Sequence, residues 1–350
     1  MRVTEGTSVE AWYRLSESLA AHPVLAGLGK KPAVWIAPSA LSALNEVLSA
    51  LAWRTWISGS EAKTVTFLSK VDPDLDRLAK KAGEVGLSSK AMDLAQWKSA
   101  EPRSSAFDAR AAVFWTEVDF ATGELIPVPG EIEASLQSKT DREVKVRLEH
   151  FSWRKSLWMT PLAAYEVRVV GFSGRSGSCA LVLLGDRLRS FVARNLPFAW
   201  SHESLEEAGR TLLSQMQGLA DHWIDSGKAS HMEDFAACAE LMRVELLKLQ
   251  SVNSVTLGGS SGDAGLWIHL KDRNGQEFSE ALRKANPSLL QANQLLSLSQ
   301  LAHSDPWMAD WLLSTKRVDT DLISGCCWLS PDFVAFAARS SGRALNLFSV

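Results

Sequence analysis

The sequence predicts an α/β protein with a large domain, whose mainly parallel sheet lies between helices, and a smaller α+β domain at the carboxyl end. Two observations predict this fold class. From about residue 33 onward, apolar or alternating runs typical of strands alternate with segments of helical period, which favours crossover connections and a parallel sheet. After Arg187, helices dominate and strands are few. We expect the large domain at 30–205 and the small domain at 206–350, with residues 1–29 packed against the small domain.

The elements of the large domain follow from local composition. Apolar side chains recur at helical spacing from Leu41 to Leu51, and Asp72-Pro73-Asp74 is a typical helix start, with a stop near Gly83 to Gly86. Short runs rich in apolar or β-branched residues, some of them alternating with charged ones, predict strands. These runs are 33–36, 64–68, 111–115, 143–148, 166–170 and 179–184.

The small domain is predicted from the same two periods. Residues 203–225 and 231–249 are helical, and the second of these helices carries Phe235, Leu241, Val244, Leu247 and Leu249 along one face. Two strands and two further helices follow, with a glycine-rich loop at 258–262. The strands are expected at 252–257 and 266–270, and the helices at 277–285 and 289–302.

Composition excludes several classes of function. The chain has 350 residues, of which 46% are hydrophobic and 22% charged, values typical of a globular protein. Its 37 basic and 40 acidic residues give a net charge of -3, so no overall field recruits nucleic acid or an anionic membrane. No run is long enough to span a bilayer. Four cysteines, two of them adjacent, favour a reduced compartment, and with no signal peptide in view we expect a cytoplasmic protein.

Individual chemical motifs are weak. The sequence contains neither a nucleophile elbow nor a glycine-rich phosphate loop. Among seven histidines only His231, with Glu233 and Asp234, approaches a cluster of metal ligands. These two acidic residues are better explained as first-turn residues of a helix, so we predict no metal site. The adjacent Cys326 and Cys327 are either reactive thiols in a loop or two small buried side chains, and the second interpretation is favoured.

The order of several partial motifs carries more information. This order of motifs resembles the order found in the cysteine desulfurases. These enzymes are class V aminotransferases, which belong to the fold-type-I enzymes that depend on pyridoxal phosphate (PLP). The resemblance covers most of the chain from about residue 33 and implies a PLP-transferase-like fold and a dimer. The matching segments are 34–45 (strand, phosphate turn and helix), 71–73, 117–132, 144–184, 243–255, the late cysteine segment 324–327 and the arginine segment 339–343.

The resemblance also assigns positions to the coenzyme, and these positions are degenerate. Where the family has an aspartate beside the pyridine nitrogen, this chain has Arg147, in a segment that ends at His150. Where the family stacks a histidine on the ring, it has Asp72. In the phosphate turn, Pro38 precedes Ser39 and lacks the N–H group of the usual residue.

The lysine that the family uses for its Schiff base is missing as well. The stretch 169–179 contains no lysine, and its Arg175 cannot form an imine because the guanidinium stays protonated. Lys155 is the nearest candidate for a displaced amine. We therefore expect no bound cofactor. We expect PLP only if such a displaced lysine forms the Schiff base.

These departures lead to a functional expectation. The chain is expected to be a cysteine-desulfurase-like pseudoenzyme that acts as a scaffold or regulatory partner in sulfur transfer, paired with itself or with an intact relative. Cys326 or Cys327 is the candidate sulfur acceptor, and Arg339 the candidate for binding a substrate carboxylate. One alternative is an active PLP-dependent cysteine desulfurase with a displaced lysine. Another is an unrelated α/β protein that binds a small anion.

Overall fold

The computed structural model describes the chain in segments, and the chain divides into two compact units. The first unit comprises residues 1–70, 74–117 and 127–224, and the second comprises 71–73, 118–126 and 225–350. The described residues are 5–28, 32–37, 39–58, 64–68, 73–92, 112–116, 118, 122–123, 144–149, 158, 160–174, 177–186, 188, 202–219, 230–259, 262, 264–272, 274–285, 295–297, 325–330 and 333–334.

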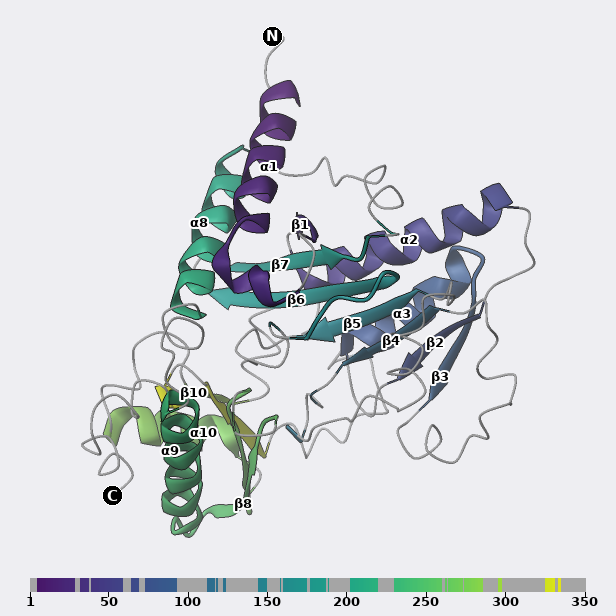
Figure 1. The fold of residues 1–350 in the computed structure, drawn as a ribbon. Coiled ribbons are helices and arrows are strands. Elements are labelled where there is room, and N and C mark those ends of the chain that lie inside the picture. Colours follow the sequence, from purple (N-terminus) through teal and green to yellow (C-terminus); the bar gives the residue numbers. More distant parts are fainter. Residues whose placement is uncertain are drawn as a thin grey trace. The chain divides into compact units, whose positions relative to one another are not determined.

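The first unit is built on a seven-stranded sheet (Figure 1) with the order β1-β7-β6-β5-β4-β2-β3. Strands β2 to β6 pair in parallel, whereas β7 is antiparallel to both of its neighbours. The sheet is therefore mainly parallel, as predicted. The strands are β1 (Ala33–Ala37), β2 (Thr64–Leu68), β3 (Ser88–Met92), β4 (Ala112–Thr116), β5 (Lys145–Glu149), β6 (Glu166–Gly174) and β7 (Gly177–Leu184).

In the described part of the first unit, four α-helices and one 3-10 helix accompany this sheet. Helix α2 follows β1 directly and is apolar on most of its circumference, so it buries Leu44, Val47 and Leu48 completely. Helix α1 contacts β1 and α8, and its Trp12 donates a hydrogen bond to the backbone oxygen of Ile36. The helices are α1 (Glu5–Ala20), η1 (Pro23–Leu28), α2 (Ala40–Ser58), α3 (Pro73–Glu84) and α8 (His202–Leu219).

The second unit contains a four-stranded antiparallel sheet with the order β10-β11-β9-β8. Helix α9 packs on β8 and β9, and α10 contacts β10 and β11. The core of this unit includes Trp267, whose ring is so close to Gly123 and Gly258 that a Cβ at either glycine would overlap it. The elements are α9 (Ser230–Leu247), β8 (Val252–Leu257), β9 (Leu266–Leu270), α10 (Gly275–Ala285), β10 (Leu295–Ser297) and β11 (Cys326–Leu329).

Most predicted elements are present, with two notable differences. The prediction of a helix at 289–302 is wrong at the centre of this range, where Leu295–Ser297 forms strand β10. Strand β3 (Ser88–Met92) was not predicted because its sequence, Ser-Ser-Lys-Ala-Met, has little apolar character, as befits an edge strand. The domain boundaries expected at residues 30, 205 and 206 stay a prediction.

Candidate functional site

The connection between β6 and β7 is the first feature of the candidate site. The two strands pair without a break from Val167 opposite Leu184 to Gly174 opposite Gly177. Only residues 175 and 176 therefore lie between them, and their sequence is Arg-Ser. Arg175 itself lies outside the described residues. The segment in which the family resemblance places the Schiff-base lysine is thus a two-residue connection without a lysine.

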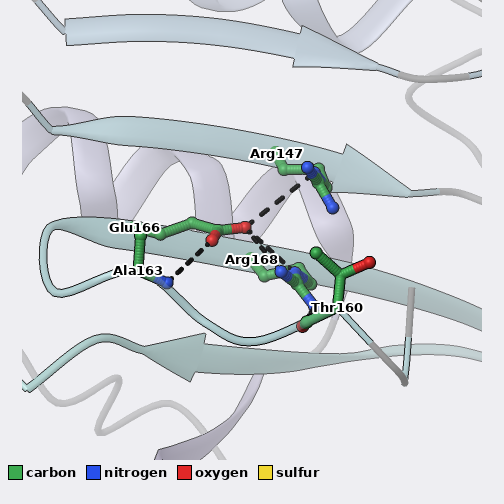
Figure 2. A network of polar contacts seen from close by, with 5 residues as sticks. All are labelled: Arg147, Thr160, Ala163, Glu166 and Arg168. Atoms are coloured by element: carbon green, nitrogen blue, oxygen red, sulfur yellow. Dashed lines mark hydrogen bonds and ion pairs between the residues drawn. The ribbon is translucent and has the colours of Figure 1, made fainter. Parts of the chain in front are cut away.

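Arg147 lies in the middle of β5 and is buried, with a relative exposure of 5%. Its register neighbours are Trp115 on β4 and Arg168 on β6, and its guanidinium lies 5.6 Å from the centroid of the Trp115 ring. Its Nε is 3.8 Å from Oε1 of Glu166 (Figure 2). Arg147 is therefore held between an aromatic face and a buried carboxylate.

Glu166 and Arg168 complete this buried cluster, which we call the β5–β6 charge cluster (Arg147, Glu166 and Arg168). Arg168 donates from Nε and Nη2 to Oε1 of Glu166 over 3.0 and 2.9 Å. The backbone N–H of Ala163 donates to the other carboxylate oxygen over 3.1 Å, and Nη1 of Arg168 donates to the carbonyl of Thr160 over 3.2 Å (Figure 2). Both Glu166 oxygens thus accept hydrogen bonds, as a buried carboxylate requires.

The pairing of Glu166 with Arg168 was not expected from the sequence. A usable signal was present, because charged residues alternate within a strand of a sheet expected to be covered on both faces. Such charges must be paired when they are buried.

Beside the cluster, the indole N–H of Trp115 is buried and has no hydrogen-bond partner in the described part of the chain. The Trp115 side chain therefore contributes packing and its contact with Arg147, while its N–H group has no partner among the described residues. An unsatisfied buried N–H lowers the stability of the folded state.

Ser39 directly precedes helix α2 (Ala40–Ser58). Its Oγ accepts a hydrogen bond from the backbone N–H of Ser42 over 3.1 Å and lies 3.2 Å from the Ser42 hydroxyl. Its carbonyl accepts the first helical bond, from Ala43. This is the geometry of a helix N-cap, so the Ser39 side chain satisfies one of the N–H groups that a phosphate would otherwise use.

Cys326 and Cys327 lie in strand β11 and are fully buried, which confirms the interpretation as small core side chains. Burial raises the pKa of Cys327 to about 12 and raises the pKa of Cys326 well above its ordinary value. The Cys327 thiol donates a hydrogen bond to the carbonyl of Gly275 over 3.0 Å. Because the thiolate is the reactive form, both thiols are suppressed as nucleophiles in the folded state.

Several predicted positions cannot be placed. Asp72, His150, Arg339 and Lys155, like Arg175, lie outside the described residues. Of the predicted positions that are described, Ser39 and Arg147 belong to the first unit and the cysteine pair to the second. Their assignment to coenzyme, sulfur or substrate stays a prediction.

A separate cavity of about 540 Å³ lies between α1 and α8, and it contains none of the predicted site residues. Its lining includes Leu15, Leu205 and Gly209, together with the exposed pair Glu10 and Arg14. Among the described residues there is no cluster of three or more histidine, cysteine or acidic side chains able to hold a metal. No described helix combines the length and the apolar character that a membrane span needs.

Comparison with known proteins identifies the fold. No protein-family profile and no curated protein sequence matches the chain. Solved structures do match it over nearly its whole length. A Campylobacter jejuni O-acetylhomoserine (thiol)-lyase, which carries pyridoxyl-lysine monophosphate, has a TM-score of 0.56 at 14% identity, over 96% of this chain and 86% of the other. A NifS-like protein has a TM-score of 0.55 at 11% identity, over 97% and 88% of the two chains.

A third structure supports the same fold. The ureidoglycine-glyoxylate aminotransferase of Bacillus subtilis has a TM-score of 0.51 at 10% identity, over 96% of this chain and 90% of the other. With the strand order of the first unit, these likenesses confirm the predicted fold, that of the fold-type-I PLP-dependent transferases. At this level of identity they establish the fold alone. The alternative of an unrelated α/β protein that binds a small anion stays a prediction.

Proposed function

We propose that this chain, which has the fold-type-I PLP-dependent transferase fold, is a cysteine-desulfurase-like protein that no longer performs PLP chemistry and acts as a scaffold or regulatory partner in sulfur transfer. The observation that carries the proposal is the β6–β7 connection. A Schiff base requires a lysine amine, and the two residues between Gly174 and Gly177 are Arg-Ser. A guanidinium stays protonated and cannot replace that amine.

The environment of Arg147 supports the proposal on electrostatic grounds. PLP acts as an electron sink when a carboxylate keeps its pyridine nitrogen protonated. Arg147 is a cation instead, and a cation beside that nitrogen would lower its pKa. Its guanidinium is also engaged by Glu166 and by the Trp115 ring, so Arg147 has a structural role within the sheet.

The start of α2 supports the proposal through hydrogen bonding. A phosphate held at a helix start uses the free N–H groups of the first turn. Here Ser39 uses its own hydroxyl oxygen to accept from the Ser42 N–H, and the preceding residue is a proline, which has no N–H. The described residues therefore do not fit the coenzyme at its ring or at its phosphate, and we route no reaction through it.

The burial of the cysteine pair supports a scaffold role more than it supports sulfur transfer by this chain itself. Both thiols are buried in β11, and burial raises the pKa values of both. A persulfide acceptor needs an accessible thiolate, which these side chains do not offer. We propose that sulfur chemistry is performed by a partner and that this chain, in the cytoplasm, modulates it.

The test is an activity assay on the full chain, supplied with PLP and cysteine, with an active desulfurase as positive control. We expect no sulfide release and no yellow colour. An active, yellow preparation would overturn the proposal and would favour an active enzyme with a displaced lysine. In that case Lys155→Ala is the first variant to examine, with Lys271→Ala, an exposed lysine of the second unit, as its matched control.

A further inference from the structure

In the described part of the first unit, the seven-stranded sheet ends at β1 on one side and at β3 on the other, and these two edge strands differ in composition. Strand β3 is polar. Its Ser88, Ser89 and Lys90 are exposed, and a lysine on an edge strand discourages pairing with a further strand. Strand β1 has the sequence Ala-Val-Trp-Ile-Ala, and four of its five residues are buried. An uncharged apolar edge strand pairs readily with other strands unless another element covers it.

Helix α1 is the element that covers β1. It lies beside β1 and α8 (Figure 1) and contacts both. The indole N–H of Trp12 donates a hydrogen bond to the carbonyl of Ile36 over 3.4 Å, and the ring centroids of Trp12 and Trp35 are 6.2 Å apart. One buried side chain of α1 therefore occupies a backbone acceptor of the edge strand and also packs against its largest side chain.

The packing of α1 against α8 is incomplete. Leu15 lies so close to Gly209 that a Cβ at the glycine would overlap it. Directly beside this contact is the cavity of about 540 Å³, which Leu15 lines together with Leu205 and Leu213 of α8. Apolar side chains that line a cavity lack the contacts that a filled interface would provide. The α1–α8 interface therefore holds α1 less firmly than close packing would.

Ser16 weakens the attachment of α1 further. Its side chain is buried, and its hydroxyl has no hydrogen-bond partner within the described ranges. Burying such a hydroxyl costs free energy while α1 is packed, and this cost disappears when α1 leaves, because water then bonds the hydroxyl. The cavity and the hydroxyl thus both lower the stability of the packed helix without involving the strands of the sheet.

We propose that α1 is a detachable cover of the β1 edge. While packed, it protects the apolar edge strand; when it leaves, the sheet stays folded and β1 becomes available for pairing with another extended strand. Elements with imperfect packing open locally in this way, at a lower free energy than the whole domain. The inference concerns α1 and β1 alone. It does not depend on whether the chain binds the coenzyme, so it and the proposed function can fail separately.

Amide hydrogen exchange on the full chain tests whether the cover opens by itself. The reporters are the amides of β1, and those of the interior strand β4 serve as the reference. Exchange in β1 should be faster than in β4 and should respond less to urea, because release of one helix exposes less surface than unfolding of the sheet.

Substitution of Ser16 tests the weak attachment. Ser16→Ala removes the unsatisfied hydroxyl and should slow exchange in β1 by about fivefold or more, since α1 then opens less often. Ser18→Ala is the matched control, because it is the same change in the same helix at an exposed position and alters helix propensity equally. Any difference between the two variants therefore comes from the buried hydroxyl.

Trp12→Ala tests the opposite direction. It should speed exchange in β1 by about a hundredfold or more, because the ring and its hydrogen bond are lost. Tyr13→Ala is the control, since Tyr13 is the adjacent aromatic residue and is 49% exposed. In sedimentation velocity, Trp12→Ala should also form large particles that the wild type does not form. Adding Ala33→Lys should suppress these particles without slowing exchange, because a charge on an edge strand opposes strand pairing.

Three results would overturn the proposal. The first is equal exchange rates and equal urea dependence in β1 and β4, since α1 then leaves only when the sheet unfolds. The second is exchange in β1 that Ser16→Ala and Trp12→Ala change no more than their controls do, since α1 then does not protect the strand. The third is fast exchange in Trp12→Ala without large particles, since the released edge then does not pair. If Trp12→Ala fails to fold by circular dichroism, the two serine variants decide.

Discussion

Arg168 donates two hydrogen bonds to a single carboxylate oxygen of Glu166, and both side chains are almost completely removed from solvent. Arg147 approaches the same oxygen from the neighbouring strand. One carboxylate therefore lies between two cations within the sheet. Its loss would leave buried positive charge without this partner.

Glu166→Gln should consequently be strongly destabilising. Removing one member of a buried ion pair costs about 3–5 kcal/mol of the free energy of unfolding, because the remaining charge is desolvated. Urea denaturation measures the loss. Glu10→Gln, which removes the exposed pair with Arg14, is the control and should change stability little. Equal stability of the two variants would show that the β5–β6 charge cluster does not hold the sheet together.

Gly123→Ala should destabilise the second unit. Gly123 has a φ of 73°, and a Cβ there would lie 2.5 Å from atoms of the Trp267 ring. Gly86→Ala is the control, because Gly86 has a similar φ of 79° but open space around it. We expect the control to lose about 1 kcal/mol from backbone strain and Gly123→Ala to lose a further 1–3 kcal/mol from overlap. Similar losses in chemical denaturation would contradict this packing.

Trp115→Phe and Trp328→Phe should differ in their effects. Both remove an indole N–H, but that of Trp328 donates to the carbonyl of Ala264 over 3.0 Å, whereas that of Trp115 is unsatisfied within the described residues. Losing the Trp328 bond leaves a buried carbonyl with one partner fewer, so Trp328→Phe should be the more destabilising by about 1 kcal/mol or more. The midpoints of urea unfolding measure the difference. A larger loss for Trp115→Phe would mean that its N–H has a partner.

The cysteine pair makes the stability depend on alkaline pH. Burial raises the pKa of Cys327 from 9.0 to about 12, so the folded state retains the thiol proton at pH values where the unfolded state has lost it. The stability that the buried, protonated Cys327 thiol contributes to the folded state is therefore complete below pH 9. It is lost as the pH rises from about 9 towards 12. Cys327→Ala should show a shallower fall in unfolding free energy between pH 8 and 10, about the range in which an unfolded thiol titrates. A slope identical to that of the wild type would contradict the burial.

The sequence predicted the first unit well because its strands are apolar segments and its helices follow them directly. Residues 64–68 and 179–184 are examples, since no helical pattern competes there. Helix α9 shows what hydrophobic periodicity does not determine. Its apolar residues surround the helix, so periodicity alone could not tell that Met242 is buried and Leu241 exposed. Which side of α9 is buried depends on the position of the sheet against which the helix packs.

The site was predictable only in part. The absence of a lysine between β6 and β7 was visible in the sequence, and the strand pairing adds that the connection has two residues. The partner of Arg147 was not predictable, because the β5–β6 register brings it near a carboxylate 19 positions away along the chain. The capping role of Ser39 depends on where α2 begins, which composition defines only loosely.

The central claim is that the coenzyme's covalent anchor has been lost. The most direct measurement is the intact mass of the purified chain after incubation with PLP and reduction with borohydride, which fixes a Schiff base permanently. The active desulfurase used above is the positive control, and a chain denatured before incubation shows the labelling of its surface lysines. We predict no stoichiometric addition of one pyridoxyl group to the folded chain. A single pyridoxyl group on one specific lysine, formed only when the chain is folded, would contradict the account.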